Sequence, residues 1–140
     1  MFWDSSALVP VLVAEARSVE MIAILRKDAA PAMWWATPVE CQSALQRRRR
    51  EKILSDAALA LALVRLERLS EDLDVVAPTA RLRESAGRAL AAHALRAADA
   101  LQLAAALAWS ADDARGEGFV CLDDRLCEAA RREGFEVLPA

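Results

Sequence analysis

Short apolar runs and longer amphipathic stretches alternate along the whole chain. The apolar runs have strand length and are bounded by polar or turn-forming residues. They predict strands at Met1–Trp3, Ala32–Ala36, Leu73–Ala77, Gly118–Leu122 and Phe135–Leu138, and the first of these is expected to be buried on both faces. Apolar residues at helical spacing between them predict helices at Ala7–Val13, Glu15–Lys27, Thr37–Arg50, Ser55–Leu69, Pro78–His93 and Ala100–Trp109, and a last helix closed by Gly134. Because strands and helices alternate, we expect an α/β fold in which helices cover both faces of a parallel sheet, a three-layer α/β/α sandwich.

Three of the predicted elements carry further information. The helix Ala100–Trp109 contains one polar residue, Gln102, so we expect it to be buried at the centre of the fold. The start of the helix at Thr37 is typical of a capping box, with Thr37 as N-cap and Glu40 at the third helical position. Trp34 and Trp35 are neighbours in a predicted strand, so we expect both in the core, on opposite faces of the sheet.

Length and composition indicate one ordered domain, residues 1–140. The chain has 140 residues, of which 56% are hydrophobic, and it shows no internal repeat or linker. The longest apolar run, Ala57–Val64, is too short to span a membrane, and the N-terminus lacks the basic region of a secretory signal. Three cysteines without a metal-binding spacing, Cys41, Cys121 and Cys127, indicate free thiols in a reducing compartment. We therefore expect a soluble, cytoplasmic protein.

The net charge of −3 gives no overall attraction to nucleic acid or to anionic lipid. An enzyme that acts on nucleic acid at this charge needs a local basic patch or bound cations. Arg47–Arg50 with Lys52 is the clearest basic cluster, but four consecutive helical residues point to all sides of the helix. A solvated face is the favoured interpretation of this cluster, and contact with phosphate stays open.

Acidic residues follow the predicted strands at the positions where open α/β sheets bind ligands. Asp4 and Asp123 end the first and fourth strands, Glu40 lies one helical turn beyond the second, and Asp99 stands at the entrance of the buried helix. Carboxylates without histidine or thiolate form a site for a hard cation, Mg²⁺ or Mn²⁺. Each acid also has a structural interpretation: Asp4 caps a helix, Glu40 completes the capping box, and the other two complement helix dipoles. A carboxylate at a buried edge costs stability unless it is paired or bound to metal, which favours function for Asp99.

The remaining polar residues limit the possible chemistry. His93 is the only histidine, so acid–base catalysis by a histidine pair is excluded and metal-assisted hydrolysis of a phosphodiester remains. Arg96 and Arg125 flank the acids and are candidates for contacting a substrate phosphate, and Ser6 is a candidate for orienting a carboxylate or contacting phosphate. The chain has neither a dinucleotide-binding glycine motif nor a P-loop, which argues against a nucleotide-binding enzyme.

Four segments resemble the acidic motifs of the PIN domain: Phe2-Trp3-Asp4-Ser5-Ser6-Ala7-Leu8, Pro38-Val39-Glu40, Leu95-Arg96-Ala97-Ala98-Asp99-Ala100-Leu101 and Leu122-Asp123-Asp124-Arg125-Leu126. Their order and spacing are similar to those of VapC-type toxins of bacterial toxin–antitoxin pairs, and the resemblance covers essentially the whole chain. It implies a sheet with strand order 3-2-1-4-5 and a homodimer silenced by a cognate antitoxin. It also implies Mg²⁺- or Mn²⁺-dependent endoribonuclease activity on RNA. The catalytic residues and metal ligands would be Asp4, Glu40, Asp99 and Asp123.

The chain departs from the family pattern at two positions. Cys121 stands where many relatives have Thr or Ser, and its thiol is a poorer hydrogen-bond partner near a metal. Gln102 stands where many relatives have His, and we expect this position to matter less because it is not one of the acids. The substitution at Cys121 keeps an alternative open, a catalytically inactive PIN-like module that binds protein or RNA.

Overall fold

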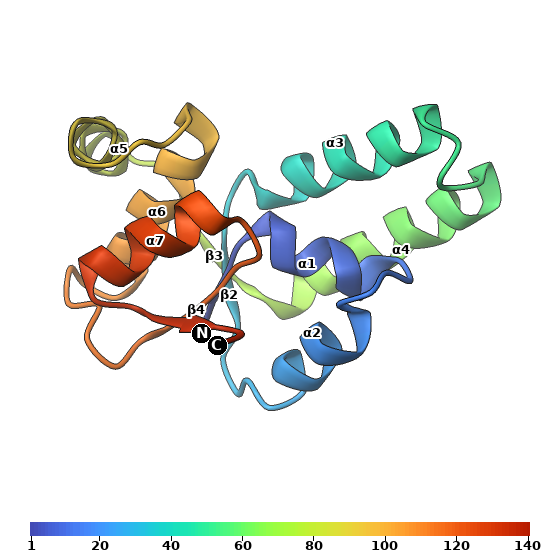
Figure 1. The fold of residues 1–140 in the computed structure, drawn as a ribbon, viewed down its shortest axis with the longest axis horizontal. Coiled ribbons are helices and arrows are strands. Elements are labelled where there is room, and N and C mark those ends of the chain that lie inside the picture. Colours follow the sequence, from blue (N-terminus) through green and yellow to red (C-terminus); the bar gives the residue numbers. More distant parts are fainter.

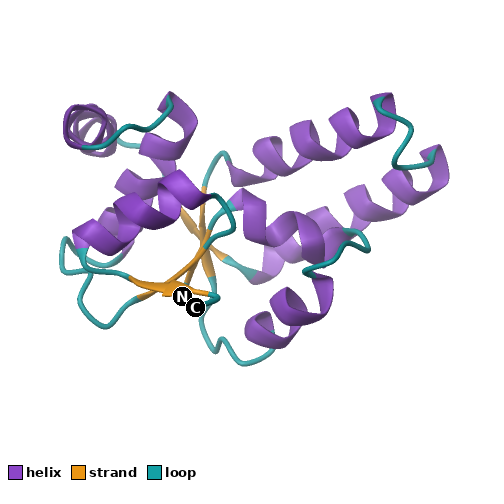
Figure 2. Cartoon of the chain, viewed as in Figure 1, coloured by secondary structure: helices purple, strands orange, loops and turns teal.

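Five short parallel strands form the centre of the molecule, and seven helices surround them (Figures 1 and 2). The computed structural model describes all residues, 1–140. The strands are β1 (Phe2–Trp3), β2 (Ala32–Trp34), β3 (Asp74–Val76), β4 (Gly118–Val120) and β5 (Glu136–Leu138). The helices are α1 (Ser5–Leu12), α2 (Ser18–Leu25), α3 (Thr37–Arg50), α4 (Asp56–Asp72), α5 (Ala80–Ala92), α6 (Ala97–Trp109) and α7 (Asp124–Glu133).

The sheet has the strand order β3-β2-β1-β4-β5, and every neighbouring pair is parallel, which confirms the expected architecture. β1 occupies the middle, where Trp3 lies opposite Met33 on one side and Val120 on the other. A strand in this position is covered on both faces, and both of its residues are fully buried. The apolar run at the start of the chain is therefore the centre of the fold.

Successive residues of the strands contribute to two separate cores, one on each face of the sheet. Phe2, Trp34 and Phe119 pack with residues of α5, α6 and α7. Trp3 and Met33 pack on the opposite face with residues of α1 to α4. The two cores give the three-layer sandwich that the alternation of elements predicts.

Two local predictions are wrong. β2 ends at Trp34, so Trp35 lies in a turn with 59% of its surface exposed and does not join the core. The capping box at the start of α3 is also absent: the N-cap is Ala36, which offers no side-chain cap, and Thr37 is the first helical residue. Thr37 is fully buried and its hydroxyl accepts a hydrogen bond from another helix. Tertiary contacts have replaced the local interaction that the sequence motif suggests.

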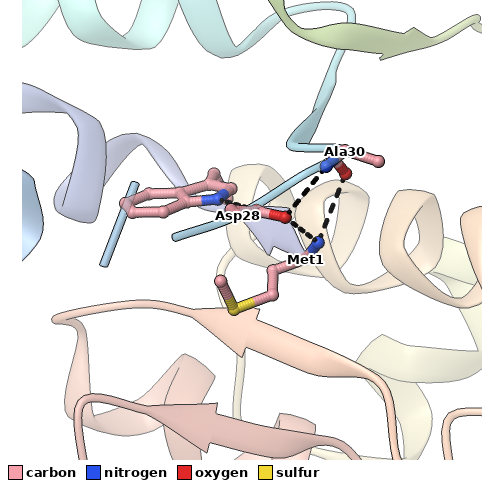
Figure 3. Close-up of polar contacts among 4 residues, drawn as sticks. Met1, Asp28 and Ala30 are labelled. Atoms are coloured by element: carbon pink, nitrogen blue, oxygen red, sulfur yellow. Dashed lines mark hydrogen bonds and ion pairs between the residues drawn. The ribbon is translucent and has the colours of Figure 1, made fainter. Parts of the chain in front are cut away.

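The amino end of β1 is fixed by polar contacts (Figure 3). The ammonium group of Met1 lies 3.0 Å from Asp28 Oδ1 and donates to the carbonyl oxygen of Ala30 at 3.3 Å. The indole Nε1 of Trp3 donates to Asp28 Oδ2 at 2.8 Å. Close packing adds to this, because a Cβ atom at Gly118 would lie 2.6 Å from Met1 Cγ. The central strand is thus held at one end, which fixes the position of Asp4 at the other.

Two further expectations concern the helices and the cysteines. None of the helices combines the length and the apolarity that crossing a lipid bilayer requires. All three cysteines are buried free thiols, as expected.

Candidate metal centre

Four acids, Asp4, Glu40, Asp99 and Asp123, lie at the carboxyl edge of the sheet, and we refer to them as the acidic cluster. Asp4 directly follows β1, and its backbone N–H donates to the carbonyl oxygen of Val120 at 3.0 Å. Asp123 follows the parallel strand β4, so both acids leave the sheet at the same edge. Glu40 and Asp99 lie in the first turns of α3 and α6. Asp99 is therefore inside its helix, which begins three residues earlier than the apolar pattern indicates.

Asp4 is the most deeply placed acid of the cluster, with 4% of its surface exposed. It is the N-cap of α1, and its Oδ2 accepts hydrogen bonds from the backbone N–H of Ser6 at 2.8 Å and from the Ser6 hydroxyl. The Ser6 oxygen in turn accepts from the backbone N–H of Leu122 at 2.9 Å, which ties the β1 and β4 ends together. Burial raises the pKa of Asp4 above its usual range, the bonds from Ser6 oppose this, and the charge of Asp99 raises it further.

Glu40 is held from inside the core by Gln102. The Gln102 amide nitrogen donates to Glu40 Oε2 at 2.8 Å and to the Thr37 hydroxyl oxygen at 3.0 Å. Gln102 itself is fully buried, and its Oε1 has no partner. Burial raises the pKa of Glu40, hydrogen bonds from Gln102 and Ser5 lower it, and the charges of Asp4 and Asp99 raise it again. Gln102 is not one of the acids, but it holds one of them in place. In the sequence, the signal for this contact is that Gln102 is the single polar residue of an apolar helix.

Asp99 and Asp123 lie at the outer side of the cluster. Burial raises the pKa of the half-buried Asp99, and so does the charge of Asp123. The backbone of Arg96 and the charges of Arg96 and Arg125 act in the opposite direction, so both arginines lie near this end of the site. Asp123 is exposed and caps α7 through a hydrogen bond from the backbone N–H of Leu126 to Oδ1, at 2.9 Å. One of the structural roles expected for Asp123 is therefore present.

The thiol of Cys121 lies against the cluster from the end of β4. Its Sγ is 3.7 Å from Asp4 Oδ2 and 3.6 Å from the Ser6 oxygen, and the backbone N–H of Asp123 donates to it at 3.3 Å. A hydrogen bond involving Cys127, burial and the charge of Asp4 all raise the pKa of Cys121. Cys121 is consequently a neutral thiol at physiological pH and adds no negative charge to the site.

No cation of the protein neutralises the acidic cluster. The chain has 18 lysine and arginine residues, yet none of its ion pairs within 4.0 Å includes one of the four acids. Carboxylates that repel one another in a partly buried site favour a bound cation, and oxygen ligands favour a hard one. No three acidic, histidine or cysteine side chains are arranged here as ligands of one ion. The donor chemistry therefore fits a divalent cation, and closing the cluster around one requires side-chain movement.

Comparison with known proteins agrees with this architecture. A family model described as PIN domain matches residues 1–132. The crystal structure of PAE2754 from Pyrobaculum aerophilum aligns with a TM-score of 0.68 at 20% identity, over 98% of this chain and 87% of that one. The crystal structure of FitAcB from Neisseria gonorrhoeae aligns with a TM-score of 0.66 at 14% identity, over 97% and 94% of the two chains. No curated protein matches the sequence significantly. At these identities the two structures show a shared fold.

Proposed function

Because this chain belongs to the PIN-domain family, we propose that it is a metal-dependent endoribonuclease that hydrolyses RNA phosphodiester bonds. The observation that carries the proposal is the acidic cluster. Three of its carboxyl groups, those of Asp4, Glu40 and Asp99, have raised pKa values and no cationic partner. Buried carboxylates without a cationic partner destabilise the folded chain, and such groups are expected where a cation binds and a reaction takes place.

Each residue of the site has a role in this proposal. Asp4, Glu40 and Asp99 would hold Mg²⁺ or Mn²⁺, with Asp123 as a direct or water-mediated ligand. The chemistry that such a cation would supply here is activation of water and stabilisation of negative charge on the leaving oxygen. Ser6 keeps Asp4 Oδ2 in place, and Gln102 does the same for Glu40 Oε2.

Positive charge for the substrate comes from the arginines beside Asp99. The charges of Arg96 and Arg125 lower the pKa of Asp99, but neither arginine forms an ion pair with it. Their guanidinium groups are therefore available to a substrate phosphate. A reaction of this kind does not use the 2′-hydroxyl group of RNA. Preference for RNA then comes from the shape of the substrate and from groove contacts.

The biological setting follows from the resemblance to VapC-type toxins. We propose that the protein is the toxin of a toxin–antitoxin pair, acts in the cytoplasm as a homodimer and is silenced by a cognate antitoxin. Analytical ultracentrifugation of the purified chain tests the dimer. Co-expression with the product of an adjacent small gene, followed by a ribonuclease assay, tests the antitoxin.

The activity is tested by incubating the purified chain with a panel of structured and single-stranded RNAs. The reactions contain Mn²⁺, Mg²⁺ or EDTA, and Asp4→Asn is purified and assayed in the same way. We expect cleavage that requires the metal and is lost in the variant. Cleavage that persists in EDTA would point to a contaminating ribonuclease or to a different mechanism.

Two observations favour a second function, a PIN-like module that binds RNA or protein without catalysis. No three ligand side chains are arranged around one ion, and the neutral Cys121 thiol stands where many relatives have a hydroxyl. Calorimetry with Mn²⁺ separates the two functions. If the chain binds no Mn²⁺ and cleaves no RNA, the binding module becomes the better interpretation.

A further inference from the structure

A cavity of about 360 Å³ opens beside Glu40, between the first turn of α1 and the exposed side of α3. Its polar lining consists of Ser5, Ser6, Glu40, Ser43, Arg47 and Arg48. Glu40 and Ser6 belong to the candidate metal centre, so the cavity is continuous with that site. The volume is sufficient for part of a nucleotide, since ligand pockets begin at roughly 300 Å³.

The four consecutive arginines of α3 have different surroundings. Arg48 forms an ion pair with Glu15 and also donates to the carbonyl oxygen of Ala44. Arg49 forms an ion pair with Asp56. Arg47 and Arg50 have no carboxylate within ion-pair distance, and of these two only Arg47 lines the cavity. The basic cluster therefore contains a single unpaired guanidinium group that faces the site.

Helix geometry explains why Arg47 is the residue at this place. It lies seven positions after Glu40, which is almost two complete turns, so both residues share one side of α3. Seven residues advance the helix by about 10 Å, which separates the positive charge of Arg47 from the negative charge of Glu40. Ser43 lies between them on the same side, and its side chain is exposed.

We propose that this cavity binds a non-scissile phosphate of the substrate RNA, next to the phosphate that is cleaved. The guanidinium group of Arg47 contacts the phosphate, and the Ser43 hydroxyl supports it. Glu40 repels an anion at the other end of the cavity, so the phosphate lies at the Arg47 end. This inference rests on the proposed function, because it assigns a substrate contact to the same site.

The test compares Arg47→Ala with Arg50→Ala, which removes the same charge one turn away and outside the cavity. The substrate is a single-stranded RNA cleaved in the panel above, assayed with Mn²⁺. We expect Arg47→Ala to lower kcat/KM by about tenfold and Arg50→Ala by less than about twofold, because only Arg47 makes a charge-assisted hydrogen bond. Arg47→Lys should recover part of the loss, since lysine keeps the charge without the planar fork. Both positions are exposed, so the variants should have the thermal stability of the wild type.

A set of substrates identifies the phosphate itself. Each carries one uncharged methylphosphonate linkage at a different distance from the cleaved bond. With the wild-type protein, we expect the methylphosphonate at one position of the RNA to lower kcat/KM by about as much as Arg47→Ala does. With the Arg47→Ala protein, a methylphosphonate at that position should have no further effect. Additive losses at every position would overturn the proposal, and so would equal losses in Arg47→Ala and Arg50→Ala.

Binding without cleavage separates this inference from the proposed function. Fluorescence anisotropy of a labelled single-stranded RNA in EDTA gives Kd as a function of salt concentration. We expect the slope of log Kd against log salt to fall by about 0.7 in Arg47→Ala and to stay unchanged in Arg50→Ala, because Arg50 lies outside the cavity. RNA binding that depends on Arg47, with no cleavage of any RNA in the panel and no Mn²⁺ binding by calorimetry, supports the phosphate site and rejects the nuclease. Cleavage without a specific effect of Arg47 supports the nuclease and rejects the phosphate site. If the chain neither binds nor cleaves RNA, both proposals are overturned.

Discussion

An aspartate lies near each end of the central strand, and the charges that surround the two carboxylates differ. At the amino end, the side chain of Asp28 is 5% exposed and is paired with the Met1 ammonium group and the Trp3 indole. At the carboxyl end, Asp4 is 4% exposed and has hydroxyl and amide donors, no cation, and other carboxylates nearby. Burial alone therefore does not distinguish a structural acid from a functional one. The balance of charge around the acid does.

The difference has a thermodynamic consequence. A buried carboxylate with an ionic partner and two donors contributes to stability, because its loss leaves other polar groups unpaired. The raised pKa of Asp4 means that its ionised form is less stable in the folded state than in the unfolded chain. Ionised Asp4 thus destabilises the protein until a cation binds, and the predictions below test this contrast.

The largest expected effect is on catalysis. Asp4→Asn should lower the proposed ribonuclease activity by about three orders of magnitude, because a bound cation supplies several kcal/mol of transition-state stabilisation. Asparagine is also a good N-cap, so α1 should remain intact. The matched control is Asp28→Asn, which should retain activity below its melting temperature. Comparable losses in both variants, measured as kcat/KM on one RNA, would remove the distinction between the two aspartates.

The second effect is stabilisation by metal. At a Mn²⁺ concentration 100 times its Kd, the wild type should gain about 2.7 kcal/mol in free energy of unfolding. Asp28→Ala should gain the same increment, and Asp4→Asn should gain little. Urea denaturation with and without Mn²⁺ measures this. An equal gain in Asp4→Asn would place the cation elsewhere.

The third effect is the cost of removing the paired aspartate. Asp28→Ala should lower the free energy of unfolding by about 2 kcal/mol, because the Trp3 indole N–H and the Met1 ammonium group lose their acceptor. Asp28→Asn keeps an acceptor for the indole and should cost less. Asp4→Asn, without metal, should cost nothing or stabilise the protein. Chemical denaturation of the three variants in EDTA measures their free energies of unfolding and so tests the expected order of stability.

The fourth effect tests Gln102 as a positioning residue. Gln102→Leu should lower activity by about tenfold, at the low end of what the loss of an outer-shell partner costs. The hydrogen bond from Gln102 lowers the pKa of Glu40, so its removal should move the acidic limb of the pH–rate profile to higher pH. Gln102→His keeps an N–H donor and should restore part of the activity. A loss of activity with an unshifted profile would indicate a purely structural role.

The smallest effect is the pH dependence of stability without divalent ions. The pKa of Asp4 is raised in the folded state, so its contribution to stability is fully present below 3.8, the unfolded value, and is lost as the pH rises through the folded value. Asp4→Asn lacks this loss, so its advantage over the wild type should grow from about pH 4 to neutral pH. Urea midpoints of both proteins across this range provide the measurement. An advantage that shrinks with pH would contradict the raised pKa.

Periodicity was sufficient for most of the fold, and it failed where long-range contacts decide. All five strands lie within the predicted apolar runs. Burial on both faces explains the runs of the inner strands β1, β2 and β4, whereas the edge strands β3 and β5 are partly exposed. Trp35 looked like part of β2, and its backbone N–H still donates to the carbonyl oxygen of Val76 in β3, but the chain turns at Trp35 and its side chain is exposed. Thr37 looked like a helix cap, but its hydroxyl is used by Gln102, 65 residues away. The order of the strands came from the family resemblance, since periodicity carries no information on it.

The sequence by itself determined the alternation of elements and the positions of the four acids at strand and helix ends. These are local properties, set by side-chain spacing and by capping chemistry. Only the tertiary structure decided which charges are neutralised: Asp28 meets the chain terminus, Arg48 meets Glu15, and the acidic cluster meets no cation. Whether two charges pair depends on their distance in space. A hydrophobic pattern predicts the face of a helix or strand on which a residue lies, but it does not predict which residues of other elements lie next to it. For this reason the sequence did not show that Asp28 is paired with a cation and that Asp4 is not.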